Sequence, residues 1–181
     1  MGNFNRFLEV VKKYSEAYRD FEEIQKAPDF DFVPETGDQK TGIIGEAFLF
    51  EYLKRKGHPD LEFGHAAQKG WDIKYSLGSA SNGIVLVQVK TVSAFSKSKA
   101  ISDIHITPDY CELYLVSLNE DLIPDNIWKP NGFSPAKKKF QDGEEVVIGA
   151  RLPKNADDSA SGFTKIENIF EGFKKAFPEL Y

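Results

Sequence analysis

The sequence predicts a single domain of the mixed α/β (α+β) class over residues 1–181. Three observations predict it: helical apolar patterns near the N-terminus, β-branched runs in the middle of the chain, and one more helical pattern near the C-terminus. Of the 181 residues, 41% are hydrophobic and 13% are aromatic, which supplies one well-packed core but not two. No internal repeat or low-complexity tract interrupts this pattern.

The first predicted element is an amphipathic helix over residues 4–21. Apolar side chains recur there at steps of three and four and charged side chains fill the opposite side, with Asn3 or Asn5 as the N-cap. A second helix is predicted over residues 42–56. It is apolar on most sides, which is typical of a helix buried against a sheet, and Gly57 ends it.

A β-rich stretch is predicted next. A short strand over residues 61–63 precedes a second strand over 71–75 and a strongly β-branched third strand over 84–91. Asn82-Gly83 is a turn signal between the last two, and it predicts that they pair as an antiparallel hairpin.

The rest of the chain completes the predicted α/β order. A short helix is expected over residues 93–100, followed by a buried strand over 113–118. An irregular β region is expected around Ile127 and residues 146–148. A final amphipathic helix is expected to begin at Thr164.

Composition excludes several kinds of protein. The single cysteine, Cys111, excludes an internal disulfide and a zinc site made of cysteines alone, and it fits a reducing cytoplasm. No apolar run approaches the ~20 residues that span a bilayer, and residues 1–6 lack the apolar stretch of a signal peptide. Lys40-Thr41 has no glycine directly before the lysine, which excludes a phosphate-binding loop. We therefore expect a cytoplasmic protein with no membrane partner and no nucleotide cofactor.

Four polar residues stand where the apolar pattern does not predict them. Glu46 lies inside the apolar helix of residues 42–56, and Asp72 begins the second strand. Gln88 and Lys90 interrupt the third strand, on one face by its alternation, and the hairpin would place Asp72 opposite them. Because burying an unpaired charge is costly, such groups normally gather around a partner or a metal. Two carboxylates, an amide oxygen and an ammonium suit a hard cation.

The motifs around these residues carry a resemblance to a known superfamily. They are Gly45-Glu46 in the helix, Gly70-Trp71-Asp72 at the second strand, and Gln88-Val89-Lys90, sixteen positions beyond Asp72, in the third. Together they resemble the PD-(D/E)XK nuclease superfamily. The resemblance implies a restriction-endonuclease-like core over about residues 42–118, ordered as helix, three strands, helix and strand around a mixed central sheet.

Two features depart from the family pattern. Gln88 stands where the family usually has Asp or Glu, although some members work with glutamine there. A neutral amide oxygen still ligates Mg²⁺ but contributes less charge, so lower metal affinity is expected. A literal Pro-Asp dipeptide at Pro59-Asp60 lies in the loop after the helix, twenty-eight positions before Gln88, and we prefer Asp72 for its strand context.

The resemblance implies a metal-dependent nuclease that hydrolyses phosphodiester bonds. Glu46 and Asp72 would hold Mg²⁺, with Mn²⁺ as a substitute, and Gln88 and the Val89 carbonyl would complete the shell. Lys90 would orient the attacking water or stabilise charge on the phosphate oxygens. The expected activity is that of a restriction-type endonuclease on double-stranded DNA. Cutting both strands needs two copies of one site, so a homodimer is expected.

Charge counted locally favours a DNA partner. The net charge of the whole chain is -5, but residues 69–100 carry five lysines and one acid and are therefore at +4. A lysine-rich loop next to strands gives the same count, so both interpretations stay open. The candidate contacts to the DNA backbone are Lys69, Lys74, Ser93, Ser96, Lys97 and Lys99.

Other functions of the same fold stay open. One is a nuclease for repair, recombination or transposition, and another is a DNA-binding module that has lost activity with Gln88. Residues 119–181 lie outside the resemblance, and we expect them to form a peripheral region for specificity or dimerisation.

Overall fold

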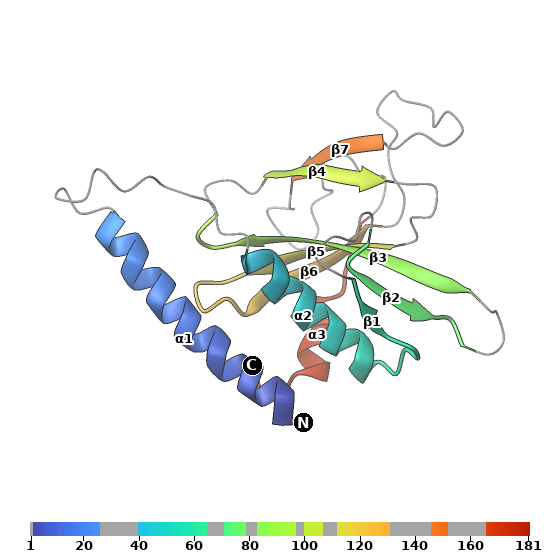
Figure 1. The fold of residues 1–181 in the computed structure, drawn as a ribbon, viewed down its shortest axis with the longest axis horizontal. Coiled ribbons are helices and arrows are strands. Elements are labelled where there is room, and N and C mark those ends of the chain that lie inside the picture. The colour runs from blue at the N-terminus through green and yellow to red at the C-terminus, as the bar shows by residue number, and fades with distance from the viewer. Residues whose placement is uncertain are drawn as a thin grey trace.

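The computed structural model describes residues 2–25, 40–64, 71–78, 83–96, 100–106, 112–130, 146–151 and 166–181 (Figure 1). Its helices are α1 (Gly2–Gln25), α2 (Lys40–Arg55) and α3 (Phe170–Ala176). Its strands are β1 (Glu62–Phe63), β2 (Ile73–Ser76), β3 (Ile84–Ser93), β4 (Ala100–Ile106), β5 (Glu112–Leu118), β6 (Pro124–Pro130), β7 (Val146–Arg151) and β8 (Ile166–Asn168). The predicted α/β class is confirmed.

The main sheet has six strands in the order β1-β2-β3-β5-β6-β8. It is mixed, because β3 and β5 run parallel while the other neighbouring strands are antiparallel. The predicted hairpin is confirmed: β2 pairs with β3, with Ile73 opposite Val87 and Ser76 opposite Ile84. The expected turn residue Asn82 lies outside the described residues.

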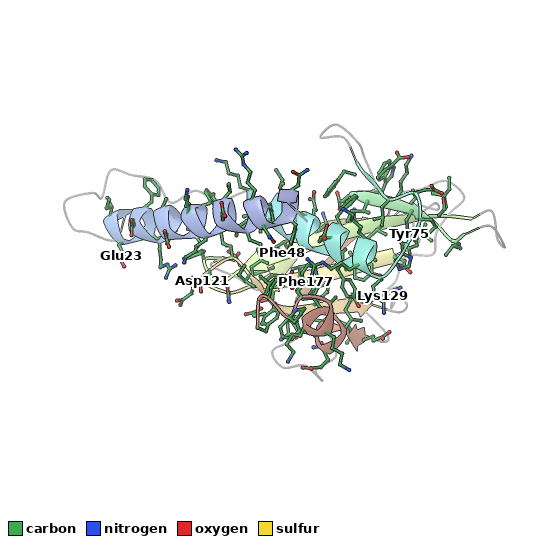
Figure 2. All side chains as sticks on the ribbon, turned by 90° about the horizontal axis from the view of Figure 1, so that it is seen from below. Glu23, Phe48, Tyr75, Asp121, Lys129 and Phe177 are labelled. Atoms are coloured by element: carbon green, nitrogen blue, oxygen red, sulfur yellow. The ribbon has the colours of Figure 1, made fainter. Side chains whose placement is uncertain are left out.

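The helices cover one face of this sheet. In Figure 1, α2 crosses the sheet while β4 and β7, which pair with each other, lie beyond β3 and β5 on the side away from α1 and α3. The core combines apolar side chains of α2 with strand residues that point to the same face, among them Phe48, Val89 and Val116. Both other helices join it, since Val11 of α1 and Phe173 of α3 belong to the same buried cluster. Figure 2 shows Phe48 and Phe177 within this interior.

The short helix expected over residues 93–100 is wrong for the residues that the structure describes. β3 continues to Ser93, a turn follows to Ser96, and strand β4 begins at Ala100. Isoleucines at positions 101, 104 and 106 favour β structure, and β4 finds a partner in β7 across a register shift between Ile101 and Ile104. The described part of the connection from β3 to β5 therefore holds a strand where the family's order has a helix.

The expected start of the last helix at Thr164 is also wrong. Residues Ile166–Asn168 form β8 on the edge of the main sheet, and α3 begins only at Phe170. At this boundary Ile169 is the N-cap, and Asn168 Oδ1 accepts a hydrogen bond from the N–H of Phe170 at 2.9 Å, which favours a turn before the helix. The apolar spacing continued across this boundary and concealed it.

Two further expectations need adjustment. α1 already begins at Gly2, so Asn3 and Asn5 lie inside the helix and do not cap it. Within residues 119–181, strands β6 and β8 extend the main sheet, and Phe173 and Phe177 are fully buried in the core. This part of the chain is therefore integral to the fold, while its role in specificity or dimerisation stays a prediction.

Candidate active site

Asp72 is fixed at the point where β2 leaves β3. Its N–H donates to the Val87 carbonyl at 2.8 Å, and its Oδ2 accepts a hydrogen bond from the N–H of Val89 at 2.7 Å. The backbone N–H and C=O of one strand residue project toward the same neighbour, so the Val89 carbonyl also faces this edge. The structure thus brings Asp72 beside the backbone of the Gln88-Val89-Lys90 motif.

Gln88 and Lys90 lie in a continuous strand and share one of its faces. Gln88 is buried, with 6% of its surface exposed, and Lys90 is half-buried. The Oε1 of Gln88 has no hydrogen-bond partner among the residues that the structure describes. A buried amide oxygen without a donor is unfavourable, so this atom is suited to receive a ligand.

Glu46 reaches the same region from α2. It follows Gly45, a buried glycine that packs directly against Thr91 of β3. Burial and, to a smaller extent, the nearby Asp72 carboxylate raise the pKa of Glu46 to about 7, while Lys90 acts in the opposite direction. Glu46 of α2, Asp72 directly before β2 and Lys90 of β3 are therefore close enough to interact electrostatically.

The surroundings of Asp72 also shift the pKa of its carboxyl group. Burial raises its pKa above the ordinary value, while the hydrogen bond from Val89 and the charge of Lys90 lower it. The site therefore holds two acids whose negative charge is disfavoured and one nearby ammonium. A cation bound between the two carboxylates would relieve both.

The raised pKa of Glu46 makes stability depend on pH. Its folded-state pKa of about 7 lies above the ordinary 4.5, so the folded protein binds this proton more tightly than the unfolded chain. The resulting stabilisation is complete below pH 4.5 and is lost as the pH rises through about 7. Glu46→Gln replaces the titrating carboxyl group with an amide that stays neutral at every pH in this range. In metal-free buffer, urea unfolding measures the free energy of unfolding of the variant minus that of wild type. This difference should be larger at about pH 8 than at about pH 5, because only wild type loses stability over that range. An identical difference at the two pH values would contradict the prediction.

The donor set fits Mg²⁺ or Mn²⁺. The candidate donors are the neighbouring carboxylates of Glu46 and Asp72, the Val89 carbonyl beside Asp72, and the unpartnered Oε1 of Gln88 in the same motif, all of which are oxygen ligands. Within the described ranges, no group of three or more His, Cys, Asp or Glu side chains is arranged to hold a metal. The candidate set has two acids, Glu46 and Asp72, with neutral oxygens beside them in the sequence motif.

The candidate DNA contacts differ in whether the structure describes them and in how exposed they are. Lys69, Lys97 and Lys99 lie outside the described residues. Lys74 is held by Glu62 at 2.8 Å and lies over the Trp71 ring. Ser93 is 2% exposed, and its hydroxyl lies 3.4 Å from the Ser96 hydroxyl, so it does not face a surface where DNA could bind. Ser96 is exposed and keeps its predicted role as a candidate.

The contact between Gly45 and Thr91 is a feature that sequence analysis missed. The signal available was a glycine inside the most apolar helix, where glycine is unfavourable. Such a glycine often marks close approach of another element, but the sequence did not indicate which one.

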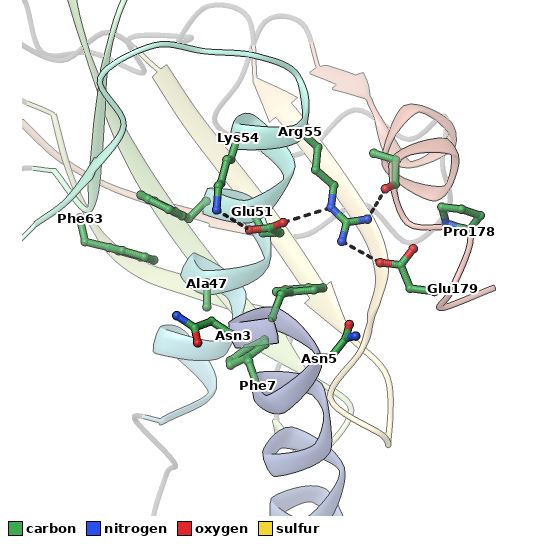
Figure 3. A pocket seen from close by; sticks show the side chains of 13 residues that line it. Asn3, Asn5, Phe7, Ala47, Glu51, Lys54, Arg55, Phe63, Pro178 and Glu179 are labelled. Atoms are coloured by element: carbon green, nitrogen blue, oxygen red, sulfur yellow. Dashed lines mark hydrogen bonds and ion pairs between the residues drawn. The ribbon is translucent and has the colours of Figure 1, made fainter. Parts of the chain in front are cut away.

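The groove in Figure 3 is separate from these residues. It has a volume of about 1270 Å³ and lies among α1, α2, Phe63 of β1 and the segment after α3. Arg55 dominates its polar side, where it bonds Glu51, Glu179 and the carbonyl of Ala176. Its lining includes none of the candidate site residues.

Comparison with known proteins adds no further identification: no family model matches the chain, and no curated protein matches it in sequence. Among the described helices, none is both long enough and apolar enough to cross a membrane.

Proposed function

We propose that the protein is a Mg²⁺-dependent endonuclease of the PD-(D/E)XK type that hydrolyses phosphodiester bonds in double-stranded DNA. One observation carries the proposal: Glu46 of α2, Asp72 directly before β2 and Lys90 of β3 lie close enough that Asp72 and Lys90 shift the pKa of Glu46 and Lys90 shifts that of Asp72. The unpartnered Oε1 of Gln88, in the same motif, supports it. A purely structural cluster would pair its buried polar atoms internally.

The arrangement of elements lends support to the family core. α2 is followed by the antiparallel β1, β2 and β3, and β5 then returns parallel to β3. The departure is β4, which stands where a helix is expected. The candidate residues lie on α2, directly before β2 and on β3, so β4 carries none of them.

Each residue has a separate task in the proposed reaction. Glu46, Asp72, Gln88 and the Val89 carbonyl would hold the ion, which supplies Lewis-acid polarisation of the phosphate and a lowered pKa for a bound water. The hydrogen bond from the Val89 N–H fixes the orientation of the Asp72 carboxylate toward the site. The Lys90 ammonium would bind a phosphate oxygen and stabilise the negative charge that develops on it. Two copies of this site, in a homodimer, would cut both strands.

The direct test is cleavage of supercoiled plasmid by the purified chain. Nicked and linear products are expected with Mg²⁺ or Mn²⁺ and none with excess EDTA. Discrete fragments would support a restriction-type enzyme. Preference for nicked or branched duplexes would instead favour repair, recombination or transposition. Intact plasmid under all metal conditions would contradict a nuclease function.

A DNA-binding module without activity is the second candidate, and the neutral Gln88 is the observation that favours it. This function predicts that the chain binds a DNA duplex without hydrolysis and binds no metal at Asp72. Titration calorimetry with Mn²⁺ distinguishes the two candidates, because the enzyme must bind the ion with wild-type Asp72 and lose it with Asp72→Ala.

Gln88→Glu should strengthen metal binding. The substitution adds a negative charge to a site already containing two carboxylates, and the side chain has nearly the same size. We expect the Mg²⁺ concentration for half-maximal cleavage to fall by roughly tenfold, at some cost in stability of the metal-free protein. Calorimetry and metal-dependent cleavage measure this. Unchanged metal dependence would argue that Gln88 is not a ligand.

A further inference from the structure

The spacing between α2 and β3 depends on one close contact. A Cβ added at Gly45 would lie 2.1 Å from Thr91 Oγ1, 2.8 Å from its Cγ2 and 3.0 Å from its Cβ. These distances are far below ordinary van der Waals separation. Only a residue without a side chain therefore fits at position 45 while the helix keeps its present distance from the strand.

This contact lies next to two residues of the site in sequence. Glu46 follows Gly45 on the helix, and Lys90 precedes Thr91 on the strand. We propose that the Gly45–Thr91 contact is the positioning device of the site, setting the distance of Glu46 from Lys90 and Asp72. The inference rests on the proposed function for its metal readout, but its geometric content is independent of catalysis.

Two observations separate this role from ordinary packing. Thr91 Oγ1 is buried without a hydrogen-bond partner in the described part of the chain, so the hydroxyl is tolerated there at a cost. Gly42, one turn earlier on α2, has no such restriction: the nearest atom to an added Cβ is Glu46 Oε1 at 4.0 Å. Close approach is therefore specific to position 45.

Gly45→Ala should displace α2 from β3 by about 1 Å, because its Cβ needs ordinary contact distance from Thr91. A displacement of that size in a preorganised site costs up to about 10²-fold in rate. Mn²⁺ affinity should fall by roughly 10- to 100-fold, as when supporting contacts around a metal site are lost. The KM for DNA should change little, because the substitution does not touch the expected DNA surface.

Rescue by a second substitution tests the contact itself. Thr91→Ala removes Oγ1 and Cγ2, so Gly45→Ala/Thr91→Ala retains only the contact with Cβ at 3.0 Å. The double variant should recover Mn²⁺ affinity and rate to within a few-fold of Thr91→Ala alone. Gly42→Ala is the matched control for the helix itself, with the same added methyl group but no contact closer than 4.0 Å, and should leave the separation of Glu46 from Lys90 as in wild type.

The outcomes are decisive. A folded Gly45→Ala with wild-type Mn²⁺ affinity, or a double variant as impaired as Gly45→Ala, overturns the inference. If Gly45→Ala does not fold, the double variant decides through its own affinity, which must match that of Thr91→Ala. If wild type neither binds Mn²⁺ nor cleaves DNA, the proposed function fails. Crystal structures of wild type and the folded variants then test the separation of Glu46 from Lys90 directly, and an unchanged separation overturns the inference.

Discussion

Lys90→Ala should lower the rate of Mg²⁺-dependent plasmid cleavage by roughly 10²–10³-fold while the protein stays folded and still binds Mn²⁺. Lys90 carries no ligand oxygen, and its charge acts on Glu46 and Asp72 across space. Its loss removes the ammonium that would stabilise charge on the phosphate. The carboxylates that hold the ion remain. The effect should therefore appear in kcat.

The measurement pairs single-turnover cleavage with Mn²⁺ calorimetry on the same preparation. Lys175→Ala, which removes an exposed lysine of α3, is the control for the loss of one positive charge and should cleave like wild type. Wild-type cleavage by Lys90→Ala would contradict the assignment of Gln88-Val89-Lys90 as the catalytic motif. Loss of Mn²⁺ binding together with cleavage would instead assign Lys90 to the integrity of the metal site.

The sequence predicted those parts of the site that depend on local pattern. The position of Asp72 followed from the β2–β3 hairpin, and the structure pairs these strands as expected. Period-two alternation placed Gln88 and Lys90 on one face, and the continuous β3 agrees. Glu46 was selected because a carboxylate inside an apolar helix is unfavourable without a charged or polar neighbour. In the structure, Asp72 and Lys90 lie near enough to shift its pKa.

Contacts between distant elements could not be predicted in this way. The approach of Gly45 to Thr91 depends on how α2 docks on the sheet, and Ser93 became buried because β3 runs beyond its predicted end. The final helix was expected too early because Ile166 and Ile169 are three residues apart, which is a helical spacing, although Ile166 belongs to β8. At that boundary the side chain of Asn168, one residue before the N-cap Ile169, accepts a hydrogen bond from the N–H of Phe170.

Phe173→Ala should destabilise the protein by about 3–5 kcal/mol, a large share of the stability of a small domain. Phe173 is fully buried, and its ring stacks on Phe177 at 4.4 Å and approaches Tyr52 and Phe48 of α2 at 5.5 and 6.4 Å. Truncation would leave a cavity between α3 and α2 that rigid neighbouring rings cannot fill. Urea unfolding measures the loss.

Phe21→Ala is the matched control, because Phe21 is 50% exposed on α1 and the same truncation there should change stability by no more than about 0.5 kcal/mol. The comparison also tests whether the C-terminal helix α3 contributes to the stability of the core. A loss below about 1 kcal/mol at Phe173 would mean that α3 is dispensable to the core. A full loss would mean that α3 buttresses α2, the helix that carries Glu46. Cleavage by Phe173→Ala should then fail at the temperature where its fold is lost, with Mn²⁺ binding lost in the same transition.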